Sequence, residues 1–299
     1  MSDLTDQTNE RKLESAAALS LSKPVNNTRF RRFLVLASIK IVKHFRRNNG
    51  VLNISSGICV KYGQLKTLAE ASAMKFIGEH TSIPVPKTYC SFVHKGRTYI
   101  VMEMIRGDYM GRGWVYRTPE SKARIHSQLR DMIAEMRRLV PTTSRIANVD
   151  GGILLDGRIM GPMQFGPFEN TNEFHRYLRG GLHEHSSKYP EGVNELIDWH
   201  DGPWPAPPVF THGDLSSLNI LADGDKVVGI VDWETAGCIP PIGSIRQRCT
   251  SIRETCFGRK RLTNSWIQYP PRKLWRRFGK DTLGIAEPRS TLPKPTTTW

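Results

Sequence analysis

Residues 210–234, "FTHGDLSSLNILADGDKVVGIVDWE", decide the expected fold, because they set polar side chains at the edges of two apolar runs. The first part has the form H-G-D-x-x-x-x-N, which contains Asp214 and ends at Asn219. Asp232 follows the second apolar run. Since Asp223 and Gly224 favour a tight turn, the two runs are predicted to pair as a hairpin. This pairing brings Asn219 and Asp232 to the same end of the hairpin.

These polar side chains have the spacing of a phosphoryl-transfer site. Such a site needs a carboxylate that orients or accepts the proton of the attacking hydroxyl, ligands for Mg²⁺, and a lysine on the nucleotide phosphates. Mg²⁺ is usually held by one or two carboxylates together with phosphate and water. We therefore predict Asp214 as the base and Asn219 and Asp232 as the metal ligands. The alternative is that these three residues are helix caps and turn acids with no common role. In that case their spacing would be a coincidence.

Upstream segments offer a lysine and a partner acid. Residues 51–63, "VLNISSGICVKYG", read as two short strands around a turn, with Lys61 on the second strand. Residues 66–80 have helical spacing, and Glu70 lies on an otherwise apolar face of that helix. A carboxylate in such a position needs a partner. Taken alone, a lysine in a strand and a glutamate on a helix are weak signals.

The remaining pattern is a mixture of helices and antiparallel strands. A leading helix is predicted over 28–47, because apolar residues recur there at three- and four-residue steps. A hairpin is predicted over 87–107, and a long helix from Thr118, which precedes a proline. A short helix is expected near 174–178. The fold class is therefore α+β.

Length and composition exclude several classes of protein. A chain of 299 residues can form two lobes with a cleft between them. No apolar run approaches the length of about 20 residues that crosses a bilayer, and the polar opening lacks the pattern of a secretory signal. We therefore expect no membrane partner and a cytoplasmic location by default. The five cysteines include no C-x-x-C pair and are assigned no chemistry.

The net charge of +15 is concentrated at one end of the chain. Residues 243–299 hold 13 Lys and Arg against 3 Asp and Glu. This segment has no sustained periodicity, so we expect a loosely ordered basic tail. A basic arm for nucleic acid is one alternative, with "GRKR" at 258–261 as a localisation patch. Basic runs are more often solvated surface, and a nucleic-acid partner is not expected.

Several motifs in order give the sequence a family resemblance. "TSIPVPK", "YIVMEMIRG", "FGPFEN" and "FTHGDLSSLNIL" occur between residues 51 and 241. Together with the V-D-W-E strand end, they resemble the aminoglycoside phosphotransferase family, especially its fungal-type branch. The resemblance implies a bilobal protein-kinase-like fold, with a small β-rich N-terminal lobe over 28–105 and a larger, mostly helical C-terminal lobe over 106–242. A disordered segment, 1–27, is expected before these lobes.

The resemblance also implies roles for individual residues. Asp214 corresponds to the catalytic aspartate, and Asn219 and Asp232 to the metal ligands. Lys61 corresponds to the lysine on the nucleotide phosphates, and Glu70 to the acid that pairs with it. The implied cofactors are ATP and Mg²⁺.

Residues 101–105, "VMEMI", look like the hinge between the lobes. The resemblance implies that the Glu103 carbonyl and the Ile105 amide take the adenine edge, while Met102 lines the pocket. His212 is expected to brace the loop by hydrogen bonding rather than to react.

The sequence also departs from related patterns. It lacks the G-x-G-x-x-G loop and the A-P-E segment of a protein kinase, and its first hairpin offers only residues 55–57 over the phosphates. A serine hydrolase built on Ser216, His212 and Asp214 is disfavoured, because there is no G-x-S-x-G elbow. After residue 242 the expected helices are missing, so the C-terminal lobe is expected to be incomplete. We hypothesise that the tail reflects an alternative or mispredicted exon end, which sequencing the transcript would test.

The predicted function is an ATP-dependent phosphotransferase that moves a phosphoryl group to a hydroxyl of a small molecule. The alternative is a catalytically impaired pseudoenzyme that binds nucleotide but lacks an acceptor pocket. The pattern does not specify the acceptor, the choice between ATP and GTP, or the oligomeric state.

Overall fold

The computed structural model describes residues 22–45, 50–139, 145–159, 162–189, 192–203 and 207–240. The predicted tail and nearly all of the predicted N-terminal segment lie outside these residues and stay predictions. The N-terminal part contains two helices and four strands: α2 (Arg29–Phe45), β1 (Val51–Asn53), β2 (Ile58–Gly63), α3 (Leu68–His80), β3 (Thr88–His94) and β4 (Arg97–Glu103). These elements confirm the helices and hairpins that periodicity predicts in this region.

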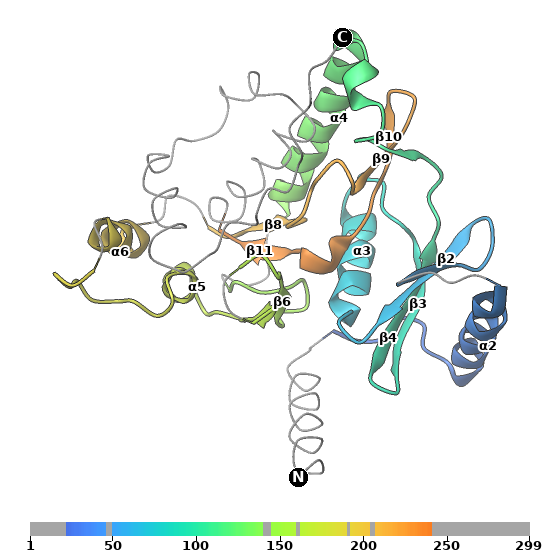
Figure 1. Cartoon of the computed structure of the whole chain (residues 1–299), viewed down its shortest axis with the longest axis horizontal. Coiled ribbons are helices and arrows are strands. Elements are labelled where there is room, and N and C mark those ends of the chain that lie inside the picture. The colour runs from blue at the N-terminus through green and yellow to red at the C-terminus, as the bar shows by residue number, and fades with distance from the viewer. Residues whose placement is uncertain are drawn as a thin grey trace, which may run out of the picture.

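The four strands form one antiparallel sheet in the order β1-β2-β4-β3. Alternate side chains on a strand point to opposite faces of a sheet. Val60 accordingly packs with Val35 and Ile39 of α2 on one face, whereas Ile100, which pairs with Lys61, packs with α3 on the other. Lys61 therefore lies on the α3 side. Figure 1 shows α2 at the outer edge of the sheet and α3 between the sheet and the rest of the chain.

The C-terminal part combines three α-helices with short strands and 3₁₀ turns: β5 (Asp108–Tyr109), η1 (Trp114–Tyr116), α4 (Pro119–Arg138), β6 (Leu154–Leu155), β7 (Gln164–Phe165), α5 (Thr171–Leu178), α6 (Val193–Asp201), β8 (Val209–Thr211), β9 (Ile220–Asp223), β10 (Lys226–Ile230), η2 (Trp233–Thr235) and β11 (Gly237–Ile239). The molecule is thus α+β, with a β-rich lobe followed by a part that holds most of the described helix. The predicted start of α4 is confirmed, since Thr118 Oγ1 accepts a hydrogen bond from Ser121 N at 3.2 Å.

The hairpin predicted from the opening stretch is present. β9 and β10 are antiparallel, and Lys226 pairs with Asp223 across the turn. At the other end, Val231 N donates to Asn219 O at 2.9 Å. Asp232 then takes a left-handed backbone conformation, with φ 66° and ψ 57°. Asp is one of the few non-glycine residues that adopt this region, so the backbone turns sharply where the site begins.

A shared core fixes the two parts relative to each other. Met74 and Ile77 of α3 lie in one cluster with Phe210, Ile230 and Trp233. The Trp233 side chain is 1% exposed, and its indole N–H donates to Ile230 O at 2.8 Å. The helix that carries Glu70 and the turn that carries Asp232 therefore belong to the same packed unit.

Gly237 supports the strand pair that leads into the site. It pairs with Thr211 across β11 and β8, and a Cβ added there would lie 2.7 Å from Ala147 O and still closer to a Leu154 methyl group. Because a backbone carbonyl cannot move cheaply, Gly237→Ala is expected to lower the free energy of unfolding by about 1–3 kcal/mol. Chemical denaturation measures this change.

The matched control is Gly57→Ala, because a Cβ at Gly57 would meet no atom within 4 Å. This substitution is expected to change the free energy of unfolding by no more than about 0.5 kcal/mol. Equal effects of the two substitutions would contradict the proposed role of the close approach at Gly237.

Candidate active site

Lys61 is the centre of a group of charges in which Lys61 and Glu70 are buried and the others are partly exposed. Its side chain is 8% exposed, and its Nζ lies 2.8 Å from Glu70 Oε1 and 2.6 Å from Asp232 Oδ1. A third carboxylate, Glu234 Oε2, lies 3.2 Å from the same nitrogen and also pairs with Lys66. Glu70, Asp232 and Glu234 are called the carboxylate cluster below. Lys61 thus joins β2, α3 and the end of the β9–β10 hairpin.

The charges in this group perturb one another. Burial alone would lower the pKa of Lys61, but the carboxylate cluster outweighs it and raises that pKa above its ordinary value. Burial raises the pKa of Glu70, against the opposing attraction of Lys61. Burial also acts to raise the pKa of Asp232, but Lys61 and Lys66 hold it below its ordinary value. Asp232 is therefore ionised at neutral pH.

The carboxylate cluster has the donors that a divalent cation needs. One oxygen from each of its three side chains lies within 4.8 Å of the others, and hard cations such as Mg²⁺ take oxygen ligands. Three carboxylates against Lys61 and Lys66 leave an excess of one negative charge when all are ionised. Glu234 was not selected from the sequence, although it stands two residues after Asp232 in V-D-W-E, which is the signal that could have identified it.

Asn219 contacts Asp214 through its side-chain amide. Its Nδ2 donates to Asp214 O at 2.7 Å and lies 3.3 Å from Asp214 Oδ2. This contact uses the amide nitrogen and leaves Oδ1 as the side-chain atom that could face a cation. The structure thus brings Asn219 to Asp214 and Asp232 to Lys61.

Asp214 has a cationic partner that its sequence neighbours do not reveal. Arg158 Nη1 pairs with Asp214 Oδ1, and Arg158 Nε donates to Asp156 Oδ1 at 2.8 Å. Arg158 lies between β6 and β7, and it contacts residues 212–219, called the catalytic loop below. Burial would lower the pKa of Arg158, but Asp156 and Asp214 raise it. Arg158 and Asn219 therefore orient the Asp214 carboxylate from two sides.

His212 ties the catalytic loop to the segment before Asp232. Its ring is 1% exposed, with Nε2 3.0 Å from Val231 O and Nδ1 accepting from Asp214 N at 3.1 Å. Both ring nitrogens therefore contact backbone groups, which agrees with a bracing role. These contacts also argue against a hydrolase in which His212 activates Ser216.

The hinge residues lie at the end of β4. Met102 pairs with Cys59 in the sheet, and Glu103 O lies 3.7 Å from Cys59 Sγ. The Ile105 side chain covers Gly229, where an added Cβ would lie 2.7 Å from Ile105 Cδ1. The hinge thus passes directly over β10.

The first hairpin turn lies beside the hinge and not beside Lys61. Met104 N donates to Gly57 O at 3.0 Å, and Ile58 pairs with Glu103, whereas Lys61 pairs with Ile100. Three residues of strand separate the two positions, about 10 Å. The antiparallel register therefore places residues 55–57 beside the end of β4, at the start of β2.

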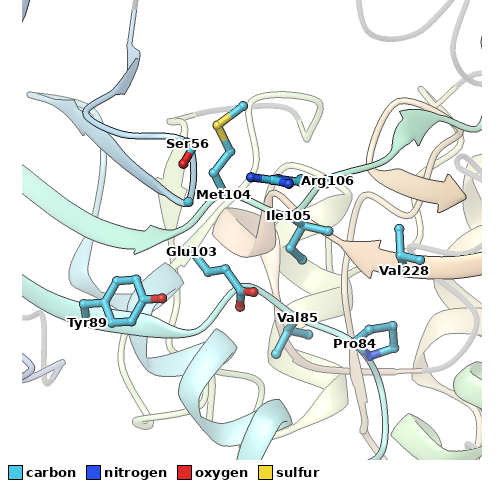
Figure 2. A pocket seen from close by; sticks show the side chains of 10 residues that line it. Ser56, Pro84, Val85, Tyr89, Glu103, Met104, Ile105, Arg106 and Val228 are labelled. Atoms are coloured by element: carbon cyan, nitrogen blue, oxygen red, sulfur yellow. The ribbon is translucent and has the colours of Figure 1, made fainter.

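A cavity of about 570 Å³ opens at the hinge (Figure 2). Figure 2 shows Glu103 and Ile105 on one side of it and Val85 and Val228 facing them. Of the sequence-predicted nucleotide residues, Glu103 and Ile105 line this cavity, whereas Lys61, Glu70 and Met102 do not. The predicted phosphate contacts therefore lie outside the lining of this cavity.

The cysteines and the helices outside the site can also be compared with the expectations from sequence. Among the described ranges, no helix has the length and apolarity needed to cross a membrane. Cys59, Cys90 and Cys238 are free thiols, and burial raises the pKa of Cys59 and Cys238 to about 11. Such thiols are weakly reactive, as expected for structural cysteines.

The sequence is similar to part of a longer plant protein. A probable acyl-CoA dehydrogenase IBR3 of Arabidopsis thaliana is 25% identical over 183 residues, which cover 55% of this chain. The matched part is 20% of that protein, so the chain spans about a fifth of its length.

Two solved structures are also similar. Aminoglycoside phosphotransferase APH(3'')-Id of Streptomyces rimosus, with ADP and streptomycin, is 15% identical, with a TM-score of 0.46 over 82% of this chain and 90% of that one. A thermostable mutant of APH(4)-Ia, with AMP-PNP and hygromycin B, is 12% identical, with a TM-score of 0.47 over 78% and 75%.

A family model described as the phosphotransferase enzyme family matches residues 62–242. The match spans more than half of the 299 residues and includes the catalytic loop, Asp232 and Glu234. The chain therefore belongs to the phosphotransferase enzyme family.

Proposed function

We propose that this chain is an ATP-dependent phosphotransferase that transfers the γ-phosphoryl group to a hydroxyl of a small molecule. One observation carries the proposal: Lys61 Nζ lies 2.6 Å from Asp232 Oδ1, and the hairpin that presents Asp232 also presents the catalytic loop with Asp214. A phosphate-binding lysine, a metal-binding carboxylate and a base are the parts that phosphoryl transfer needs.

Each group has a role that follows from its surroundings. Lys61, protonated at all physiological pH values, contacts the nucleotide phosphates and neutralises their charge. Asp232 and Asn219 Oδ1 would hold Mg²⁺, with Glu234 close enough to join them. Mg²⁺ supplies positive charge to the phosphate oxygens during transfer. Glu70 keeps Lys61 in place from the α3 side.

Asp214 acts on the acceptor. The acceptor oxygen forms a bond to the γ-phosphorus as the bond from that phosphorus to the ADP oxygen breaks. The hydroxyl proton passes to the Asp214 carboxylate, which Arg158 and Asn219 hold in position. Proton transfer of this kind contributes about 10²–10⁴-fold to a rate.

The pseudoenzyme alternative is not favoured by these contacts. A chain that had lost transfer would have no reason to keep an oriented base, yet Asp214 is held by a guanidinium and an amide. Nucleotide binding alone does not separate the two functions, because both require Lys61 and Asp232. A measurement of phosphoryl transfer, and of its dependence on Asp214, distinguishes the active enzyme from the pseudoenzyme.

Binding of Mg²⁺ and ATP should stabilise the protein. At a ligand concentration of about 100 times Kd, the gain is about 2.7 kcal/mol, which corresponds to a rise in Tm of roughly 5–10 °C for a domain of this size. We expect this rise with ATP and Mg²⁺ together, and a much smaller one when the metal is chelated. Differential scanning fluorimetry measures it.

Asp232→Ala should lose the Mg²⁺-dependent part of the rise. The matched control is Asp223→Ala, since Asp223 is an exposed acid at the opposite end of the same hairpin, and this variant should keep the full shift. A shift in the intact chain that is independent of Mg²⁺, or one that survives in Asp232→Ala, would contradict the assignment of Asp232.

A further inference from the structure

Helix α2 exposes large apolar side chains along one side. Phe30 is 69% exposed, Phe33 67%, Leu34 46% and Ile41 63%. Their spacing places them on one helical face, called the outer face below. No other α-helix among the described residues carries an exposed large apolar side chain. The outer face is therefore a continuous apolar strip and not a set of scattered surface residues.

The opposite side of α2 fixes the orientation of the outer face. Val35 and Ile39 are 8% and 7% exposed and pack in the core cluster that covers the sheet. The Arg32 guanidinium lies over the Phe92 ring, 5.6 Å from its centroid. Figure 1 shows α2 at the outer edge of the molecule beside β2 and β3. Because the helix is anchored from one side, the outer face points away from the sheet.

Cations flank the outer face on both sides. The helix contains five Lys and Arg residues and no acidic one. At about 100° per residue, Arg31 falls on one side of the apolar strip, and Arg29 and Lys40 fall on the other. All three are exposed. An apolar strip between two rows of positive charge is the arrangement of helices that lie in a membrane interface.

We propose that the outer face of α2 binds the surface of membranes that contain anionic lipids. The four apolar side chains would enter the boundary between head groups and acyl chains, while Arg29, Arg31 and Lys40 contact the anionic head groups. This proposal departs from the expectation of no membrane partner, which rested on the absence of a spanning segment. A helix that lies in the interface needs no spanning length.

Charge complementarity favours lipid over a second copy of the chain and over the basic tail. A second copy would use the same face in a symmetric contact, which brings the basic flanks of the two helices together, and like charges in an interface are repulsive. The chain's own tail, residues 243–299, holds 13 basic against 3 acidic residues and is repelled in the same way. A nucleic acid matches the charge but does not use four exposed apolar side chains.

The experiment is co-sedimentation of the full chain with vesicles. Vesicles of phosphatidylcholine with about 30% phosphatidylserine are compared with vesicles of phosphatidylcholine alone. The chain is expected to bind the anionic vesicles at least about tenfold more tightly, and added salt should weaken this binding. A folded chain that does not sediment with the anionic vesicles would overturn the proposal.

A double variant, Phe30→Ser with Phe33→Ser, tests the apolar strip. Its affinity for anionic vesicles should fall at least about tenfold, since each Phe contributes apolar area to the interface. The matched control is Val115→Ser with Tyr116→Ser, because these neighbours on η1 are 75% and 89% exposed. This control should bind as the original chain does. Equal loss in both double variants would count against the outer face.

Two further measurements test whether misfolding or self-association causes the loss of vesicle binding. Thermal unfolding, and the Mg²⁺- and ATP-dependent shift, should be unchanged in the Phe30→Ser, Phe33→Ser variant, which separates membrane binding from the proposed transfer reaction. Light scattering gives the oligomeric state. A dimer that becomes a monomer in this variant would show that a second copy covers the outer face and would overturn the lipid proposal.

Discussion

Asp214→Asn is expected to lower the rate of phosphoryl transfer by about 10²–10⁴-fold while leaving the binding of Mg²⁺ and ATP intact. An amide oxygen can still accept the hydrogen bond from Arg158 and keeps nearly the shape of the carboxylate. The catalytic loop should therefore stay in place, because His212 holds it through backbone contacts. What is lost is the ability to accept the proton of the acceptor hydroxyl.

The measurement uses ATP labelled at the γ-phosphate and a panel of small molecules with free hydroxyls. The intact chain should give a labelled product with at least one of them, and Asp214→Asn should not give it at a comparable rate. The stability shift with Mg²⁺ and ATP is measured on both proteins. Asp223→Asn is the control, because Asp223 is exposed at the far end of the hairpin.

Three outcomes of this measurement lead to different conclusions. Loss of product with the binding shift retained supports Asp214 as the base. A product formed equally fast by Asp214→Asn would remove Asp214 from the reaction. An intact chain that binds Mg²⁺ and ATP but labels none of the compounds would support the pseudoenzyme that the contacts around Asp214 disfavour.

Local patterns were sufficient for most of the helices and for the β9–β10 hairpin. α3 and α4 follow from apolar residues at helical spacing, and the β9–β10 hairpin follows from two apolar runs around Asp223 and Gly224. The two strands of a hairpin pair along their length, so the residue before the first strand lies close to the residue after the second. For this reason the sequence could predict that Asn219 and Asp232 lie at one end of the same hairpin.

Contacts between distant segments could not be derived from local patterns. Arg158 reaches Asp214 across 56 residues, and nothing in the spacing of either residue requires that contact. The position of the first hairpin turn depends on the register between β2 and β4, which periodicity does not reveal. α6 was missed because its buried side has only two apolar residues, Val193 and Ile197, and its third buried residue is the polar His200.

The pairing of Lys61 with Glu70 is an intermediate case. The sequence shows a carboxylate on an apolar helix face and therefore the need for a partner, but it does not say which cation supplies it. The family resemblance names Lys61, and the two atoms lie 2.8 Å apart. Glu234 reaches Lys61 through the turn after Asp232, and its place two residues after Asp232 in V-D-W-E is the signal that could have identified this third carboxylate.

Lys61→Ala is expected to lower the free energy of unfolding by about 3–5 kcal/mol at neutral pH. Glu70 is 1% exposed and would lose the cation that offsets its burial, while Asp232 and Glu234 would remain close to it. Removing one partner of a buried ion pair costs more than the pair itself contributes, because the remaining charge is left uncompensated. The loss should therefore exceed that of an ordinary surface substitution.

The dependence of this loss on pH identifies its cause. Burial already raises the pKa of Glu70, and without Lys61 it should rise further. A carboxyl group whose pKa is higher in the folded state takes up protons on folding, so lowering the pH favours the folded state. The loss of unfolding free energy in Lys61→Ala should therefore become smaller as the pH falls from about 8 to about 5.

Lys75→Ala is the matched control for this experiment. Lys75 pairs with Glu79 at 3.8 Å on the same helix that carries Glu70, but both side chains are more than half exposed. Exposed pairs contribute about 0–1 kcal/mol, so this variant should lose little stability at any pH. Urea unfolding at each pH gives both values. A deficit in Lys61→Ala that stays constant with pH would mean that lost packing, and not the uncompensated Glu70 carboxylate, causes the destabilisation.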